Sequence, residues 1–428
     1  MLYTLSFMIA FVCSITAFAQ PALRASPDRM ESRILALGKF GANPQGGVSR
    51  LAFSEADKQG RAYIISLMKA AGLDVHLDAA ANIIGTRTGK NQTLPVIAFG
   101  SHIDSVPFGG NYDGDVGVIG AIECIEMMNQ VGIKTEHPLE VIVFTDEEGG
   151  LVGSTALIGL LKETDLEHMS TSGKTIRQGL LELGGDVGKL SSIVRRKGEL
   201  LAFLELHIEQ GGILYQEKID IGVVQGIVGI EQWDVTIEGK ANHAGTTPMN
   251  QRQDAMLAAA HLTIAINESV KSMEGAQVGT VGRIKAEPGA PNVIPGKVVM
   301  TLELRDLSHE KIMTVFEKIK QRATEIEKES GTHISFQNIN SNQPAITDKK
   351  IQDLIATASR ELGFTSKSMP SGAGHDTQDM ARIAPTGMVF VPSKDGVSHA
   401  PGEYTSAQDM ANGASVLLRT ILALDKSK

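Results

Sequence analysis

The chain has 428 residues, which is longer than one hydrophobic core usually supports and indicates about two domains. Apolar residues make up 42% of the chain and charged residues 21%, a balance that excludes a largely disordered protein. The formal net charge of −9 argues against a nucleic-acid-binding protein, which normally carries an excess of basic residues.

The N-terminus differs from the rest of the chain. Positions 2–18 are almost entirely apolar or small, and Ala17-Phe18-Ala19 gives a small-x-small cleavage pattern. We therefore expect a cleaved signal peptide at 1–19 and a secreted or periplasmic protein, because this run is too short for a membrane span. Since no Lys or Arg precedes the run, an uncleaved anchor is the alternative. No other segment is apolar enough to predict stable membrane insertion.

The cysteines restrict the kind of metal site. Cys13 lies inside the expected signal peptide, which leaves Cys124 alone in the mature chain. A disulfide scaffold and a cysteine-rich zinc site are therefore excluded. Any bound metal must be held by histidine and carboxylate side chains.

The apolar pattern after the signal peptide is that of an α/β protein. Short apolar runs predict buried strands of a mostly parallel sheet. They lie at 94–99, 139–144, 201–206 and 386–391. Between them, apolar residues at 118, 119, 122 and 125 share one face of a helix predicted over 116–128.

A different pattern begins near residue 231, where Trp233, Val235 and Ile237 alternate with polar residues as in a half-exposed strand. A helix, two strands, a helix and a strand are predicted next. They lie at 252–266, 278–284, 298–304, 309–329 and 333–337. This β-α-β-β-α-β order is typical of a small ferredoxin-like sandwich. The α/β pattern then returns, with helices at 351–362 and 406–424. We therefore predict an inserted α+β domain at 225–338, between catalytic segments at 20–224 and 339–428.

Ionisable residues follow each predicted parallel strand. They are His102 with Asp104, Glu147 with Glu148, His207, and His399. Sites in open α/β sheets form beyond the carboxyl ends of strands, so these side chains could share one crevice. Imidazole and carboxylate suit zinc, manganese or cobalt. Asp104 is placed to accept the other N–H of His102.

Asp113 lies in a glycine-rich loop before the helix at 116–128. Its two carboxylate oxygens can bridge two cations, which together activate a water and polarise a carbonyl. Each candidate taken singly has a structural alternative. Tyr112-Asp113-Gly114 is also an ordinary turn sequence, and Glu147-Glu148 is also typical of a solvated turn.

These segments together resemble the amidase branch of the M20 metallopeptidase clan, which includes N-carbamoyl-L-amino-acid hydrolases, allantoate amidohydrolases and β-ureidopropionases. The stretches most specific to this branch are 205–211 and 241–248. Further similar stretches lie at 100–107, 112–114, 145–149, 291–295, 372–376, 391–393 and 398–399. The resemblance covers nearly the whole mature chain. It implies a phosphorylase/hydrolase-like catalytic domain with an inserted lid and dimerisation domain.

The resemblance also implies a role for each site residue. The implied ligands of two divalent ions are His102, Asp113, Glu148, His207 and His399. Asp113 would bridge the ions, with His102 and His207 on opposite sides. Glu147 would be the general base, and His243 would stabilise the oxyanion, often across a homodimer. The implied substrate contacts are Gln210, Asn292, Arg305 and His375. For Arg305 a surface salt bridge is the alternative, and for His375 a compact turn.

The implied reaction is hydrolysis of a linear ureido or amide C–N bond in a small carboxylate substrate, such as an N-carbamoyl-L-amino acid or an allantoate-like compound. A secreted aminopeptidase or dipeptidase of the same clan is one alternative, and an inactive secreted binding protein is another. Phe108, Asp115 and the stretch 150–152 depart from the branch's usual pattern, which bears on the substrate and not on the metal chemistry.

Overall fold

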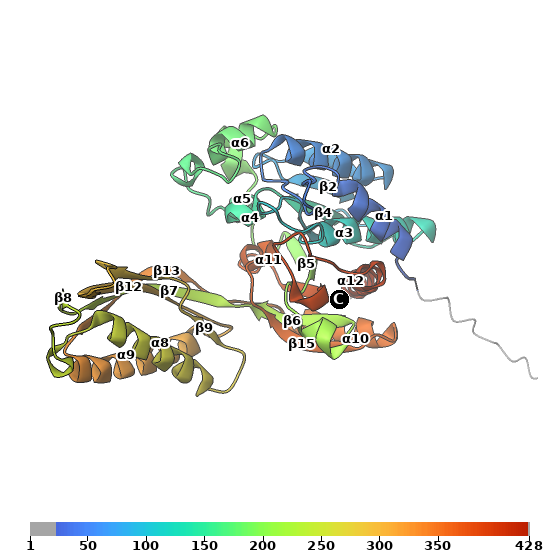
Figure 1. Ribbon diagram of the computed structural model, residues 1–428. Coiled ribbons are helices and arrows are strands. Elements are labelled where there is room, and N and C mark those ends of the chain that lie inside the picture. Colours follow the sequence, from blue (N-terminus) through green and yellow to red (C-terminus); the bar gives the residue numbers. More distant parts are fainter. Residues whose placement is uncertain (1–22, 427–428) are drawn as a thin grey trace, which may run out of the picture.

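The computed structural model describes residues 23–426, so the expected signal peptide at 1–19 lies outside the described residues. The described chain forms a larger unit around one sheet and a smaller unit that extends away from it (Figure 1). No helix within 23–426 combines the length and apolar character needed to cross a membrane.

The larger unit contains a sheet of nine strands in the described part of the chain. They are β1 (Asp74–Leu77), β2 (Ile83–Arg87), β3 (Val96–His102), β4 (Leu139–Phe144), β5 (Leu200–Ile208), β6 (Ile221–Ile227), β14 (Ala345–Ile346), β15 (Ser366–Ser371) and β16 (Thr386–Val391). The order is β1-β2-β4-β3-β5-β16-β6-β14, with β15 paired to β6. β4, β3, β5 and β16 are neighbours and run parallel, which confirms the mostly parallel sheet predicted from the four apolar runs.

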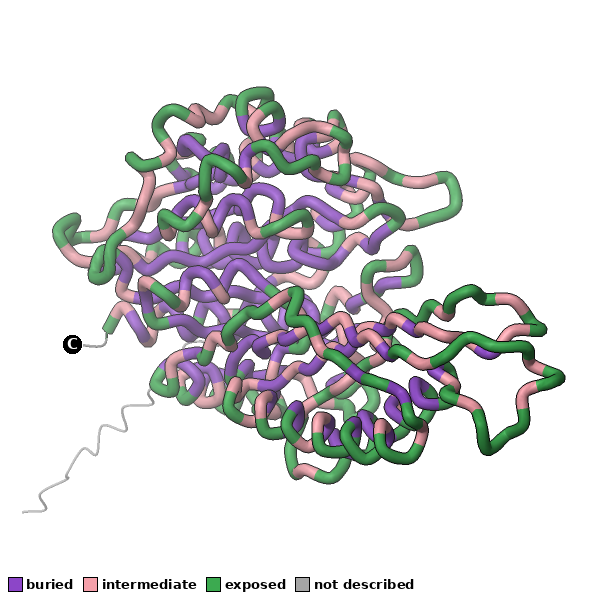
Figure 2. Tube along the Cα trace, turned by 90° about the vertical axis from the view of Figure 1, so that its left-hand side faces the viewer, coloured by how far each residue is buried: buried purple, intermediate pink, exposed green. Residues whose placement is uncertain are grey.

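Helices cover both faces of this sheet because side chains along its buried strands alternate between two apolar clusters. In β4, Val141 and Val143 pack on the side of α3 (Asp115–Gln130) and α12 (Ala407–Lys426). Ile142 and Phe144 pack on the opposite side, near α5 (Val152–Leu157) and α11 (Asp376–Met380). The buried residues form the interior of this unit (Figure 2). The remaining α-helices of the unit are α1 (Pro27–Leu37), α2 (Glu55–Ala70), α4 (Glu147–Gly150), α6 (Ile176–Glu182), α7 (Ile213–Glu217) and α10 (Lys349–Glu361).

The smaller unit is an antiparallel sheet covered by two helices. Its elements are β7 (Gly229–Glu238), β8 (Asn242–His243), α8 (Ala255–Lys271), β9 (Val278–Thr280), β10 (Ile284–Glu287), β11 (Val293–Ile294), β12 (Lys297–Asp306), α9 (His309–Ser330) and β13 (His333–Asn342). The sheet order is β10-β12-β7-β13, with β9 also on β12. α8 and α9 pack on one face, where Val298, Met300 and Leu302 of β12 are buried.

Three details of the smaller unit differ from the sequence-based prediction. The strand expected at 278–284 is two short strands, β9 and β10, which pair with different parts of β12. The strand expected to end at residue 337 continues to Asn342, with an irregularity between Asn338 and Asn340. A separate ribbon of β8 and β11 was not predicted.

Candidate metal centre and active site

The carboxyl ends of the four parallel strands meet at one edge of the sheet, as is usual for sites in open α/β folds. β3 ends at His102, and His207 is the penultimate residue of β5. Glu147 and Glu148 begin α4, directly after β4. The loop after β16 carries His399. The sheet therefore brings together four segments that are far apart in sequence.

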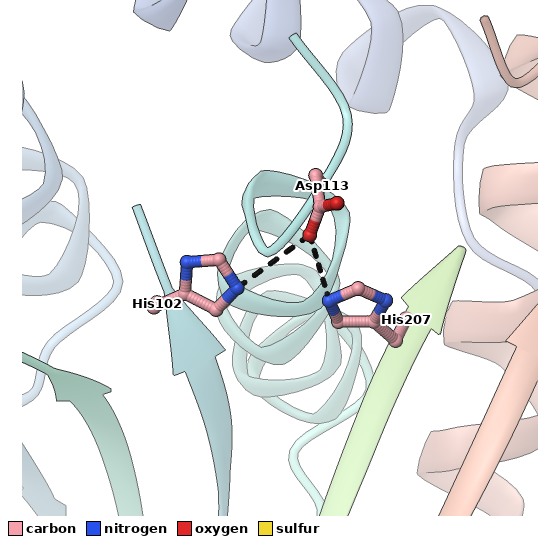
Figure 3. A group of neighbouring side chains, drawn as sticks. All are labelled: His102, Asp113 and His207. Carbon is pink, nitrogen blue, oxygen red and sulfur yellow. Dashed lines mark ion pairs between the residues drawn. The ribbon is translucent and has the colours of Figure 1, made fainter. Parts of the chain in front are cut away.

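Asp113 lies at the centre of this group. Its Oδ1 is 3.1 Å from His207 Nε2 and 3.6 Å from His102 Nε2, and both rings point toward that oxygen (Figure 3). Its Oδ2 is 3.3 Å from His399 Nε2, which is 3.4 Å from Glu148 Oε1. Two three-residue groups with metal-ligand spacing therefore share Asp113. This arrangement differs from the expected one, because His102 and His207 face the same oxygen.

The residues of the first group fit a divalent cation. His102 Nε2 is buried and makes no hydrogen bond, although it faces the carboxylates of Asp113 and Glu147. The Nδ1 atoms of His102 and His207 lie 3.1 and 2.9 Å from the main-chain carbonyls of Asp104 and Ile208. If these Nδ1 atoms carry the protons, both Nε2 lone pairs point at Asp113. A lone pair and a carboxylate that face each other repel unless a cation lies between them, so this arrangement of the two imidazoles and Asp113 suits a shared metal ion.

Asp104 has a different role from the one expected. The Asp104 carbonyl, rather than its carboxylate, makes the closer contact with the His102 ring, since the carboxylate lies 3.6 Å away. The carboxylate accepts hydrogen bonds from the backbone N–H groups of Glu147, at 3.2 Å, and Glu148, at 3.1 Å. Asp104 therefore fixes the first turn of α4, from which both glutamates project.

The environment separates the acidities of the site carboxylates. Burial raises the pKa of Glu147 well above its usual range, and the nearby carboxylates of Asp376 and Glu148 act in the same direction. For Asp113 burial acts upward too, but the imidazoles of His207, His102 and His399 hold its pKa well below the usual range. Asp113 thus remains a charged candidate ligand, whereas Glu147 can hold a proton.

Strained backbone also gathers around this site. Asp146, Leu151, Gln210 and His399 have φ values between 53° and 59°, although none of them is glycine. Such conformations persist only where surrounding contacts hold them, and they are commonest at functional sites. Because four such residues lie around this site, we infer that local contacts keep these loops in the conformations that place the site residues.

A cavity of about 210 Å³ opens beside these ligands. Its lining includes Glu147 and two of the four predicted substrate contacts, Gln210 and His375, together with Leu151 from the atypical stretch 150–152. Gln210 Nε2 donates to Asp113 Oδ2 at 2.6 Å. Burial holds the pKa of His375 well below its usual range, and His207 adds to this effect, so His375 is a neutral imidazole.

The remaining predicted residues belong to the smaller unit. Arg305 donates to Glu303 Oε1 and to the Gly372 carbonyl, each at 2.7 Å, so the salt-bridge alternative is present together with a contact to the loop before His375. His243 and Asn292 are exposed and lie at the β8–β11 ribbon. β8 is at the end of the smaller unit that points away from the larger unit (Figure 1). Within one chain, the structure does not bring these two residues to the cavity.

Asp115 and Glu403 were not assigned roles from the sequence. The charge of Asp115 is paired with Arg50 at 2.5 Å, and both side chains are buried. Asp115 therefore adds no uncompensated charge beside Asp113.

Glu403 accepts four hydrogen bonds from the segments that carry Asp113 and His399. The only sequence signal for Glu403 is its position four residues after His399.

Comparisons with known proteins agree with this geometry. The model of peptidase family M20/M25/M40 matches residues 98–423. An N-carbamoyl-L-amino acid amidohydrolase of Geobacillus stearothermophilus is 40% identical over 93% of this chain and 98% of its own length. A ureidoglycolate hydrolase of Arabidopsis thaliana is 41% identical over 92% of this chain and 86% of its own length.

A similar solved structure is an amidase of the hydantoinase/carbamoylase family from Burkholderia multivorans. It is 34% identical with a TM-score of 0.88, and the match covers 95% of this chain and all of that one. The family match spans most of the chain and both sides of the inserted unit, and the full-length relatives are well above 30% identity. On this evidence the chain belongs to peptidase family M20/M25/M40.

Proposed function

We propose that the protein is a dinuclear-metal amidohydrolase that cleaves a linear ureido or amide C–N bond of a small carboxylate. The substrate class is an N-carbamoyl-L-amino acid or an allantoate-like compound. The observation that supports this most strongly is Asp113, whose two oxygens face separate ligand groups beside Glu147. The activities after which the Geobacillus and Arabidopsis relatives are named support hydrolysis of a ureido bond rather than a peptide bond.

The proposed ligands are His102, Asp113 and His207 for one ion, and Asp113, Glu148 and His399 for the other. Bound zinc, manganese or cobalt would supply Lewis acidity and a lowered pKa of water. Glu147 takes a proton from the attacking water and later passes it to the leaving nitrogen. Burial raises the pKa of Glu147, which makes this carboxylate a better proton acceptor than an exposed one. For an N-carbamoyl-amino acid, the products are the amino acid, ammonia and carbon dioxide.

Substrate recognition is proposed for Gln210, His375, Arg305 and Asn292. Gln210 and His375 line the cavity. Arg305 reaches the loop at Gly372, which places a guanidinium close to the same crevice. A guanidinium fork suits the substrate carboxylate. Asn292 is remote from the cavity of its own chain, so it would join this contact only by reaching the site of a partner subunit.

We propose that the smaller unit, expected at 225–338, is a lid and dimerisation domain. His243 Nδ1 accepts hydrogen bonds from the backbone N–H groups of Gly245, at 3.0 Å, and Thr246, at 3.3 Å. The proton then lies on Nε2, where it can stabilise an oxyanion. Because His243 is remote from its own cavity, a homodimer in which it reaches the partner's site fits best. Exposed Leu257 and Ile264 on α8 offer an apolar surface for such contact.

We also propose that the protein is exported, because the apolar run and the cleavage pattern within residues 1–19 are typical of a signal peptide. A secreted or periplasmic enzyme would act on small ureido compounds outside the cytoplasm. N-terminal sequencing of the mature protein tests this: a chain that begins at Gln20 supports cleavage, and one that begins at Met1 contradicts it.

The function is tested with a panel of N-carbamoyl-L-amino acids, allantoate, ureidoglycolate and dipeptides, run with zinc, manganese or cobalt restored. Turnover of a ureido compound supports the proposal. Cleavage of dipeptides alone points to the peptidase alternative, and no turnover by metal-loaded protein points to a binding protein. In parallel, Glu147→Gln should keep its metal content and lose most turnover. Unchanged turnover in that variant removes Glu147 from the base role.

A further inference from the structure

Glu403 connects two segments that carry proposed metal ligands. It lies between β16 and α12, and only 5% of its surface is exposed. Its Oε1 accepts hydrogen bonds from the backbone N–H groups of Tyr112, at 2.9 Å, and Asp113, at 3.0 Å. Its Oε2 accepts from Ser398 Oγ, at 2.8 Å, and from the backbone N–H of His399, at 3.3 Å. One carboxylate therefore joins the loop of Asp113 to the loop of His399.

The backbone around Glu403 is shaped to accept this contact. A Cβ added to Gly110 would lie 2.0 Å from Glu403 Oε1, so the glycine leaves the space that the carboxylate fills. His399 has a φ of 53°, a conformation that a non-glycine residue keeps only when neighbouring contacts hold it. The Glu403 contact to the His399 N–H is one such restraint. Hydrogen bonds to an ionised acceptor are about twice as strong as neutral ones.

The other ligand group is held differently. His102 and His207 are oriented through Nδ1 by the main-chain carbonyls of Asp104 and Ile208, and Glu403 takes no part in these contacts. By contrast, Asp113 and His399 are two of the three ligands in the group completed by Glu148. Loss of Glu403 should therefore affect the two groups unequally.

We propose that Glu403 is a positioning residue that sets the spacing of Asp113 and His399, and thereby the affinity of the Asp113–Glu148–His399 group for its cation. Glu403 itself binds neither metal nor substrate. This inference rests on the proposed dinuclear centre. Loss of an outer partner of a metal ligand typically costs about 10–100-fold in metal affinity.

The test is Glu403→Gln, with Mn²⁺ titrated into metal-depleted protein. An amide keeps the size of the side chain but has a single acceptor oxygen, so it can hold only one of the two loops. Wild type should bind two equivalents and give the electron paramagnetic resonance spectrum of a coupled manganese pair. The variant should bind the first equivalent normally and the second about 10–100-fold more weakly, with an isolated-ion spectrum at one equivalent.

Glu123→Gln is the matched control. Glu123 is also a buried carboxylate, and it accepts hydrogen bonds from Ser26 and Arg29, remote from both loops. Its variant should lose stability and keep two tight sites. An equal loss of the second site in Glu123→Gln, or two unchanged affinities in Glu403→Gln, overturns the inference.

Glu403→Asp covers the case in which Glu403→Gln does not fold, and it is preferred to a Ser398 variant because Ser398 Oγ also lies 3.1 Å from Asp113 Oδ2. Glu403→Asp keeps the charge but shortens the side chain by one methylene, so the carboxylate can no longer hold both loops, and a measurable weakening of the second site is expected. An unchanged second affinity then overturns the positioning role. If wild type itself binds fewer than two equivalents, the dinuclear function fails, a result distinct from failure of the Glu403 role.

Discussion

The backbone of Gly114 lies directly against the His102 ring: a Cβ at position 114 would be 2.5 Å from both Cε1 and Nε2 of that imidazole. Gly114 also has a φ of 66°, and its N–H points at His207 Nε2 at 3.3 Å. One residue therefore passes between two proposed ligands, in a backbone conformation that favours glycine.

Gly114→Ala should abolish tight metal binding, because the added methyl occupies the place of the His102 ring. Gly132→Ala is the matched control, since Gly132 has a φ of 68° and nothing within 4 Å of an added Cβ. Both variants should lose stability through the positive φ, and Gly114→Ala should lose more because its methyl also meets the His102 ring. Metal content measured by mass spectrometry should fall only in Gly114→Ala. Full metal content in that variant would contradict the proposed ligand role of His102.

Asp104→Asn should lower turnover while leaving the substrate KM nearly unchanged. The amide can accept only one of the hydrogen bonds from Glu147 and Glu148, so the first turn of α4 is held less firmly. A loss of about 10–100-fold in kcat is expected for such an outer partner. Asp348→Asn, at the N-cap of α10, makes the same exchange away from the site and should keep wild-type kcat. Equal kcat values in the two variants would remove Asp104 from this role.

Arg305→Lys should raise KM for a carboxylate substrate, because an ammonium cannot reproduce the guanidinium fork. Losing a charged hydrogen bond of about 1.5–3 kcal/mol corresponds to roughly 10–150-fold in KM. Arg283→Lys serves as the control, because Arg283 belongs to the same unit but pairs with Asp234 on an exposed surface. Steady-state kinetics on both variants with the best ureido substrate decides the matter. A wild-type KM in Arg305→Lys would leave this residue with a structural role, through its contacts to Glu303 and to the Gly372 carbonyl.

Asp57→Asn should change how stability depends on pH. Burial raises the pKa of Asp57 from 3.8 to about 6, with Asp104 acting in the same direction and Arg61 opposing. The folded wild type therefore binds more protons than the unfolded chain between pH 3.8 and about 6, and its stability falls as pH rises through that window.

The contribution that wild type loses across this window is about 3 kcal/mol, and the asparagine variant lacks it. The melting temperature of Asp57→Asn relative to wild type should therefore rise from pH 4 to pH 7. Thermal unfolding monitored by circular dichroism across this range, with metal-free protein, provides the measurement. Parallel pH profiles for the two proteins would contradict the raised pKa.

The central strands and their attached ligands could be predicted because they depend on local pattern. A strand buried on both faces is apolar along its length. The strands at 139–144 and 386–391 could therefore be predicted from their runs of apolar residues. His102, Glu148 and His207 then followed from their positions at strand ends. β1 and β14 are short strands at the sheet edges with exposed residues, and β2 is a five-residue strand next to β1; none of them has a comparable apolar run.

Other features depend on contacts between distant segments. Glu403 bonds to main-chain groups at 112 and 113, some 290 positions earlier, and backbone donors leave no trace in a sequence. The strand expected at 278–284 is divided because its two parts pair with different stretches of β12: β9 pairs with residues 303–305 and β10 with residues 297–300. The grouping of His102 with His207 depends on the side-chain geometry around Asp113, which residue order does not reveal.

The place of β16 in the larger sheet has a consequence for the order of events in biosynthesis. β5 and β6 follow each other in the chain, yet β16 lies between them and pairs with both. The gap between these strands can be filled only after residues 386–391 have left the ribosome, when almost the whole protein has been made. His399 emerges later still. A chain interrupted before that point carries most of the proposed ligands but lacks the strand that joins the two halves of the sheet.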